Sequence, residues 1–198
     1  MARGRRINSS GEKSKKLLLE KAIELFSIHG FHQTKISDIV KSANLTQPTF
    51  YLYFKSKESL YNDLTEKFQN DLTEIFANST AEQPKVQNAS QVMKQNIQQI
   101  FDYFVSNPYL TKIGFYDSSK AEEVKQLLVL KLENAIKNYF NEYSIVKRVN
   151  TNVLAESLVG SMERLTLTNL LTYKTDPQQL AEEISMIYFS EEKSLVHN

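Results

Sequence analysis

The sequence predicts an all-α protein of about nine helices, arranged as a small N-terminal part and a larger C-terminal part. Apolar residues recur at helical spacing along most of the chain. No stretch alternates apolar and polar residues as a half-buried strand does. The stretch from Ser37 to Lys57 then reads as two short helices joined by a tight break, the pattern of a helix–turn–helix.

The first helix is expected from about Glu12 to His29, ending at Gly30. Its apolar stripe consists of Leu18, Ala22, Leu25 and Phe26. Residues 1–11 are basic and polar and are expected to form a flexible arm. Arg3, Arg5 and Arg6 of this arm suit contacts with phosphates or a minor groove, or ordinary solvation, and the sequence leaves both open.

The second helix is expected from Ser37 to Ala43. Asn44 ends it, because asparagine tolerates the left-handed conformation found at helix ends. Thr46 is the expected N-cap of the third helix, and Pro48 lies in its first turn, where a missing N–H costs little. Phe50 and Phe54 are four residues apart, so they share a face and are assigned to the core.

A long connecting helix is expected over Glu58–Phe76 with Ser56 as its N-cap, followed by a loop at Asn78–Asn88. Four further helical stretches and a short aromatic segment broken by Gly114 complete the chain. These are Ala89–Ser106, Tyr109–Tyr116, Lys120–Tyr143, Asn152–Tyr173 and Asp176–Ser190. The expected domains are therefore residues 1–57, a connecting helix at 58–77, and residues 78–198.

Composition and charge restrict the function. The chain has no cysteine, so disulfides, thiolate chemistry and zinc–cysteine sites are excluded. It has neither a secretory signal nor an apolar run of roughly 20 residues, and we expect a cytoplasmic protein without membrane contact. Residues 1–67 hold 12 Lys and Arg against 7 Asp and Glu, whereas the remainder is acidic on balance. Chance aside, a basic first third indicates a polyanion-binding head.

The helix after the tight break carries polar-tipped side chains beside basic residues, as a helix in a DNA major groove does. Gln47 suits a bidentate contact with adenine, although plain surface exposure is the alternative. The hydroxyls of Tyr51 and Tyr53 suit phosphates, or their rings are half-buried core. Lys57 is the expected phosphate contact at the start of the next helix. The predicted DNA-binding residues are Lys35, Ser37, Thr46, Gln47, Pro48, Thr49, Tyr51, Tyr53 and Lys57.

The residues from about Leu18 to Tyr61 resemble the tetracycline-repressor (TetR) family of regulators. The matching positions are Ala22, Leu25, Phe26, Gly30, Phe31, Thr34, Ile36, Ile39, Ala43, Leu45, Thr46, Thr49, Phe50, Tyr51, Tyr53, Phe54, Lys57, Glu58 and Leu60. Three positions depart from the pattern: Lys35 stands where a second threonine is common, Asn44 replaces the usual glycine, and Pro48 is a less common choice. The resemblance implies a homodimeric transcriptional regulator, usually a repressor, which leaves a palindromic DNA operator when a small, largely apolar effector binds. It also favours base readout at Gln47.

The C-terminal part carries no catalytic constellation, so we expect no enzyme activity, no cofactor and no metal. His29 and His32 lack clustered carboxylates and are interpreted as surface residues. Two alternatives remain open. One is a helical small-molecule-binding protein or enzyme with an incidental basic head, and the other is a helix–turn–helix scaffold that senses nothing.

Two clusters of the C-terminal part are assigned to regulation. An apolar effector pocket is expected at Phe101, Phe104, Tyr109, Phe115, Tyr116, Leu128, Leu132, Met162, Leu165 and Asn169, with a filled core as the alternative. A dimer surface, two helices from each subunit around a twofold axis, is expected at Val159, Leu167, Leu170, Leu171, Leu180, Ile184, Ile187 and Tyr188. The dimer would present two recognition helices about 34–36 Å apart, one turn of B-DNA.

Overall fold

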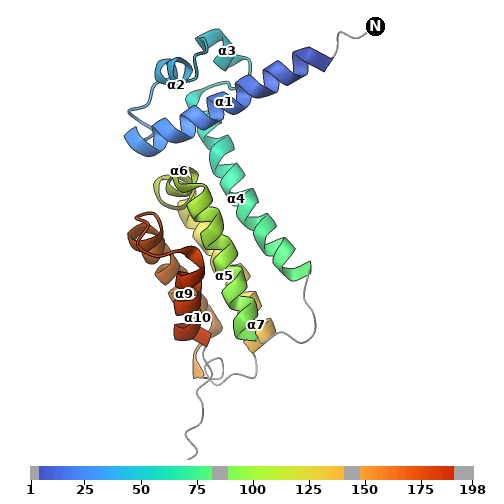
Figure 1. Cartoon of the computed structure of the whole chain (residues 1–198), viewed down its shortest axis with the longest axis vertical. Coiled ribbons are helices and arrows are strands. Elements are labelled where there is room, and N and C mark those ends of the chain that lie inside the picture. Colours follow the sequence, from blue (N-terminus) through green and yellow to red (C-terminus); the bar gives the residue numbers. More distant parts are fainter. Residues whose placement is uncertain (1–4, 82–88, 141–147, 190–198) are drawn as a thin grey trace, which may run out of the picture. The chain divides into compact units, whose positions relative to one another are not determined.

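The computed structural model describes residues 5–81, 89–140 and 148–189, and it describes side chains from residue 11 to 76 in the first of these ranges. These residues form nine α-helices and two short π-helical stretches, and they contain no strand (Figure 1). The prediction of an all-α protein is confirmed. None of the described helices is long and apolar enough to cross a membrane.

The chain divides into two compact units. The head unit comprises Met1–Asn70 and Tyr109–Ala121, and the body unit comprises Asp71–Pro108 and Glu122–Asn198. The boundary within helix α4 (Lys57–Ala81) therefore follows Asn70, and a segment from the middle of the chain joins the head unit. The functional division at residues 57 and 77 stays a prediction.

The head unit contains α1 (Arg5–His29), α2 (Ile36–Ser42), α3 (Gln47–Tyr51) and the first part of α4. Its core is formed by apolar side chains at helical spacing, all of them buried: Leu18, Ala22, Phe26, Ile39, Phe50, Phe54, Leu60 and Leu64. The expectation of a flexible arm over residues 1–11 is wrong for residues 5–11, which are helical. Adding turns to a helix that has already formed costs little, and no proline interrupts these residues.

Helix α6 (Pro108–Thr111) runs directly into the π-helical stretch η1 (Lys112–Asp117). The predicted break at Gly114 is therefore wrong. Gly114 is buried, and a Cβ atom at this position would come within 2.3 Å of the Phe68 ring. The glycine permits close approach to α4 rather than a turn. Lys112 Nζ donates to the backbone carbonyl of Ser27 at 2.5 Å, which ties η1 to the last turns of α1.

The body unit contains the second part of α4, α5 (Ala89–Ser106), α7 (Ala121–Phe140), α9 (Thr151–Leu165), the π-helical stretch η2 (Thr166–Leu170) and α10 (Pro177–Phe189). Lys125 Nζ of α7 lies 2.7 Å from Glu163 Oε1 of α9, which places α7 beside α9. The Phe140 and Phe189 rings lie 4.7 Å apart, which places α7 beside α10 as well. The ion pair and the ring contact hold α7 against α9 and α10 in one helical bundle.

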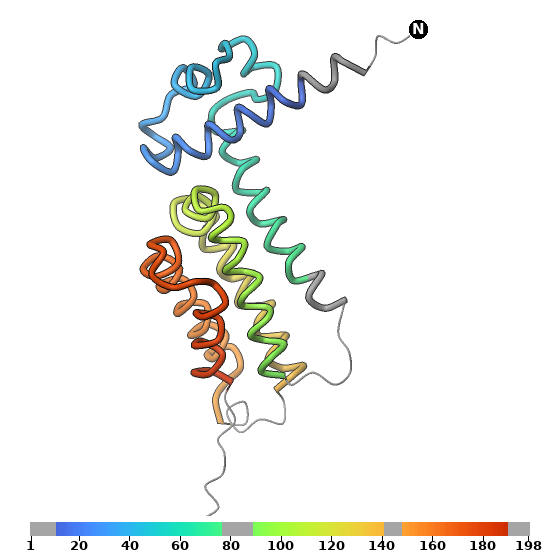
Figure 2. The backbone as a smooth tube through the Cα atoms, viewed as in Figure 1, coloured from blue at the N-terminus to red at the C-terminus, as the bar shows by residue number. Residues whose placement is uncertain are grey.

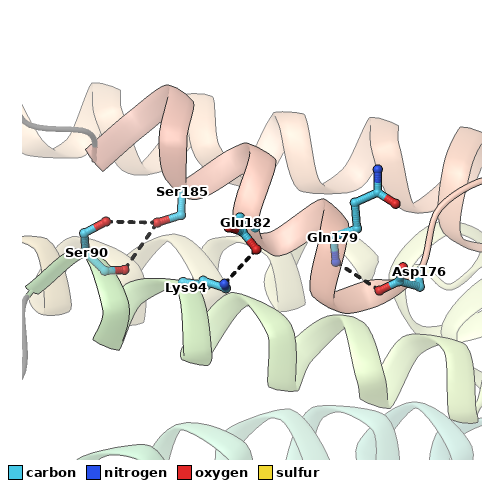
Figure 3. Close-up of polar contacts among 6 residues, drawn as sticks. All are labelled: Ser90, Lys94, Asp176, Gln179, Glu182 and Ser185. Carbon is cyan, nitrogen blue, oxygen red and sulfur yellow. Dashed lines mark hydrogen bonds and ion pairs between the residues drawn. The ribbon is translucent and has the colours of Figure 1, made fainter.

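Helix α10 packs along α5, and polar pairs fix the two helices in register. Figure 3 shows Ser90 and Lys94 of α5 facing Ser185 and Glu182 of α10. Lys94 Nζ lies 2.9 Å from Glu182 Oε2, and the Ser185 hydroxyl donates to the backbone carbonyl of Ser90 at 3.2 Å. Tyr103 of α5 donates to Asp71 Oδ2 of α4 at 2.9 Å, and burial together with this carboxylate raises the pKa of Tyr103.

Capping side chains mark the first residues of two helices. Asp176 Oδ1 accepts from the Gln179 N–H at 3.0 Å, so Asp176 caps the last helix. Ser56 caps α4, since its Oγ accepts from the Ser59 N–H at 3.2 Å. The expectation of a loop is wrong for residues 78–81, because α4 continues to Ala81. Residues 82–88, and residues 141–143 of the helix expected over Lys120–Tyr143, lie outside the described residues.

Candidate functional site

The turn between α2 and α3 has the conformation that the sequence predicts. Asn44 adopts a φ of 53°, in the left-handed region, and its N–H donates to the Lys41 carbonyl at 3.1 Å. The Leu45 N–H donates to the Val40 carbonyl at 2.8 Å, and Ala43 is buried. Figure 2 traces the backbone through this reversal. The turn consequently fixes the direction in which α3 leaves α2.

Helix α3 begins with a complete N-cap. Thr46 is extended, and its Oγ1 accepts from the Thr49 N–H at 3.4 Å. The two threonine hydroxyls also lie 2.9 Å apart. Pro48 follows in the first turn, as predicted. These contacts stabilise a helix of only five residues, which propensity alone could not.

One side of α3 is anchored in the core and the other is open to solvent. Phe50 and Phe54 are buried with their ring centroids 5.4 Å apart, which confirms both as core residues. Gln47 and Pro48 are exposed, and Tyr51 is 56% exposed. Thr49 and Tyr53 are half-buried. Gln47, Pro48 and Tyr51 are therefore accessible on a helix whose Phe50 is held in the core.

The start of α2 contributes a second accessible group. Lys35 and Ser37 are exposed, and the Lys35 N–H donates to Asp38 Oδ2 at 3.1 Å, whereas the Lys35 side chain supplies no cap of its own. Thr34 just before it is buried, and its hydroxyl donates to the carbonyls of Gly30 and Leu25. The start of α2 is thus tied to the end of α1.

The Lys57 side chain makes contacts within the head unit that its place in the sequence did not predict. Its Nζ donates to the carbonyls of Phe31 at 2.7 Å and Thr34 at 2.9 Å, and it lies 4.3 Å from the centroid of the Phe31 ring. Two of the three ammonium donors are thereby used within the head unit. Direct contact between Lys57 and a phosphate remains a prediction, now limited to the third donor. Lys41 and Lys55, which the prediction omitted, are exposed basic residues of the same segment.

The predicted effector residues divide between the two units. Phe101, Phe104, Leu128, Leu132 and Met162 are fully buried in the body unit, where Leu165 and Asn169 are half-buried. Tyr109, Phe115 and Tyr116 belong to the head unit, and Tyr109 is 48% exposed. A groove of about 470 Å³ in the body unit runs between α5 and α10 instead. It is lined by Ser90, Gln91, Lys94, Gln95, Gln98, Gln178, Glu182, Ser185 and Met186.

Only some of the residues predicted to form the dimer surface are exposed. Val159, Leu170, Leu180 and Ile184 are buried within the protomer itself, because α9, η2 and α10 turn these residues toward the bundle core. Leu167 is 45% exposed, Ile187 is 75% exposed, and Leu171 is half-buried. The hydroxyl of Tyr188 is held by Ser157 and Ser161 of α9 at 2.9 and 2.7 Å. The exposed apolar residues of the body unit outside the prediction include Val153 of α9 and Met186 of α10.

Within the side chains that the structure describes, no three His, Cys, Asp or Glu residues come together as metal ligands would. His29 and His32 are both exposed.

Comparison with known proteins agrees with the helix–turn–helix geometry. The sequence profile of the bacterial regulatory proteins of the tetR family matches residues 18–64. The uncharacterized HTH-type transcriptional regulator YdgC of Bacillus subtilis is 34% identical over 184 residues, which cover 90% of this chain and 92% of YdgC.

Solved structures share the fold over nearly the whole chain. A TetR-like transcriptional regulator from Rhodococcus sp. RHA1 superposes with a TM-score of 0.75 at 15% identity, covering 89% of this chain and 93% of that chain. The transcriptional regulator FadR from Bacillus subtilis, solved in complex with stearoyl-CoA, superposes with a TM-score of 0.68 at 18% identity. That match covers 89% of this chain and 98% of FadR.

Proposed function

Since this chain belongs to the TetR family of bacterial regulatory proteins, we propose that it is a repressor that binds a palindromic DNA operator as a homodimer and leaves it when a small, largely apolar effector binds. The observation that carries the proposal is the exposed side of α3. Gln47 and Tyr51 are accessible at opposite ends of a helix whose other side is fixed by Phe50.

The roles of the head residues follow from their positions. Gln47 lies in the first turn of α3, the end that contacts base edges in this motif, and its amide can both accept from and donate to adenine. Tyr51 and the exposed Lys35 and Ser37 suit phosphate oxygens, which fix register rather than sequence. Gln47 would therefore read the base sequence, whereas Tyr51, Lys35 and Ser37 would position the helix on the DNA backbone.

Dimerisation would use the exposed apolar residues of α9, η2 and α10. Ile187, Met186, Val153 and Leu167 leave apolar surface in water that a second copy would cover. A twofold axis through this surface would give two recognition helices for a palindromic site.

The effector would bind within the body unit. Its interior is built from fully buried aromatic and aliphatic side chains, such as Phe101, Phe104 and Leu132, which favour an apolar ligand. FadR from Bacillus subtilis, which shares the fold, binds stearoyl-CoA, so acyl compounds are the first effectors to test. Such a ligand shifts the DNA-binding equilibrium only by its differential affinity for two states of the protein.

The proposal is tested by operator selection. The full-length protein is incubated with random duplex DNA, and bound sequences are recovered and read. We expect a palindrome whose half-sites are about 10 base pairs apart, centre to centre. Recovery of no preferred sequence, together with binding that is equal for all duplexes, would contradict the proposed function.

A further inference from the structure

One hydroxyl inside the body unit has no partner. Thr166 is completely buried, and its Oγ1 makes no hydrogen bond with any residue that the structure describes. Ser118 Oγ of the head unit is the other such atom among the described side chains. A buried hydroxyl without a partner loses its hydrogen bonds to water and gains nothing in exchange, so it is destabilising.

Two neighbouring threonines, Thr168 and Thr172, satisfy their hydroxyls by a backbone hydrogen bond that Thr166 lacks. Thr168 Oγ1 donates to the Arg164 carbonyl at 2.9 Å, and Thr172 Oγ1 donates to the Thr168 carbonyl at 2.7 Å. Both bonds run back four residues along the chain, the usual way for a helical threonine to satisfy its hydroxyl. Thr166 lies in the same segment, but its hydroxyl makes no such bond to its own backbone.

The backbone is also unusual at this residue. Thr166 begins the π-helical stretch η2, and its carbonyl accepts from the Leu171 N–H, five residues ahead, at 2.9 Å. This stretch continues directly from α9 and ends that helix, and π-helical stretches are rare and frequent at functional sites. The wide turn keeps Thr166 and Leu170 buried while Leu167 faces solvent.

Buried apolar side chains lie next to η2, although its last residue, Leu170, also lines a pocket with Lys174 and Asp176. Met162, one turn before Thr166, is fully buried, and η2 packs against α5, whose core side includes Phe101 and Phe104. No lysine, arginine or histidine is buried among the described residues. An ionised group brought into this interior would find no countercharge, whereas a neutral oxygen would find one hydroxyl.

We propose that Thr166 is the polar anchor of the effector site and that the effector is a largely apolar molecule bearing one neutral carbonyl or hydroxyl oxygen, not an ionised carboxylate. The inference rests on the proposed function in taking this interior as the place where the effector binds. It goes further in naming the residue that selects the ligand and the chemical group that it selects.

The test compares four probes of similar length: 1-decanol, methyl decanoate, n-decane and sodium decanoate at pH 8. Binding of each to the full-length protein is measured by calorimetry. The neutral oxygen compounds are expected to bind more tightly than n-decane and than the ionised decanoate. Thr166→Val keeps the shape of the side chain but removes the hydroxyl. It should lower the ratio of 1-decanol affinity to n-decane affinity about tenfold.

Two matched variants complete the test. Thr166→Ser retains the hydroxyl and should retain the affinity ratio. Thr168→Val removes a neighbouring hydroxyl that already has a partner and should leave the ratio unchanged. An unchanged ratio in Thr166→Val would overturn the assignment. So would failure of both neutral probes to bind the wild type, or unfolding of the ligand-free Thr166→Val protein, since that would reveal an internal partner for the hydroxyl.

Operator binding, measured on the same proteins without probe, separates this inference from the proposed function. If the wild type selects an operator but Thr166→Val keeps the affinity ratio, only the anchor assignment fails. If the affinity ratio falls but no operator is bound, the ligand site stands and the proposed regulatory function fails.

Discussion

Replacing Lys57 by methionine tests whether this residue positions the head unit or contacts DNA. The ammonium donates to the carbonyls of Phe31 and Thr34 and lies over the Phe31 ring. These groups belong to the segment that joins α1 to α2, whereas Lys57 begins α4. Lys57 therefore holds together two parts of the chain that are more than 20 residues apart.

The magnitude follows from the contacts. A hydrogen bond from a charged donor contributes about 1.5–3 kcal/mol, and an ammonium over an aromatic ring adds about 0.5–1 kcal/mol at a partly exposed site. Lys57 is half-buried, and water can replace it at the freed carbonyls. We therefore expect Lys57→Met to lower the free energy of unfolding by about 2–3 kcal/mol, less than the sum of the separate contributions. That is a large share of the 5–15 kcal/mol typical of a native protein.

Two measurements are needed. Urea unfolding gives the loss of stability, and operator affinity at several salt concentrations gives the number of phosphate contacts. If Lys57 only positions the head unit, the affinity falls but the slope of log K against log salt is unchanged. If its third donor meets a phosphate, the slope decreases in magnitude by about 0.9 for each protomer.

Lys55→Met is the matched control. Lys55 is exposed two residues earlier, so this variant removes the same charge without removing the contacts that Lys57 makes. Its stability should equal that of the wild type within about 0.5 kcal/mol. Equal stability of the Lys57→Met protein and the wild type would refute the positioning role.

Three further predictions concern the recognition helix, the head core and the dimer. Gln47→Ala should weaken binding to the selected operator by about 1–3 kcal/mol and relax one base position; an unchanged preference after repeated selection would refute base readout. Burial, with a contribution from Asp117, raises the pKa of Tyr61 to about 12. Its folded form holds the proton more tightly than its unfolded form, so stability that is present below about pH 10 should be lost between pH 10 and 12. Urea midpoints measured over this range should fall less in Tyr61→Phe, and equal falls would exclude Tyr61 as the cause. Ile187→Asp should shift the protein from dimer to monomer in light scattering at micromolar concentration, whereas Leu130→Asp, at an exposed residue outside the predicted surface, should leave the dimer intact.

The helix–turn–helix was predictable because its signals are local. The left-handed residue Asn44, the cap at Thr46 and the buried pair Phe50 and Phe54 all lie within about three helical turns of one another. Each is decided by the backbone conformation or the side-chain spacing of its own neighbours, which a sequence displays directly. The caps at Ser56 and Asp176 were predictable for the same reason.

The regulatory residues were predicted less well. Helical spacing shows that a face is apolar, but it does not show how much of that face a neighbouring helix covers. Leu180 and Ile184 were assigned to the dimer surface, yet α10 packs along α5 and buries both, while Ile187 stays 75% exposed. Thr166 gave no signal at all, since a threonine among leucines is ordinary until its hydroxyl is found without a partner.

The sequence by itself determined the helices, the turn that orients α3 and the residues that α3 exposes, because these depend on interactions between residues close in the chain. Only the tertiary structure decided which side chains pair over long distances. It brought the Lys57 ammonium to two carbonyls of the segment between α1 and α2, placed Gly114 against the Phe68 ring, and buried the Thr166 hydroxyl without a hydrogen-bond partner. Such pairings depend on how separate helices pack, and packing is set by the fit of whole surfaces rather than by any local pattern.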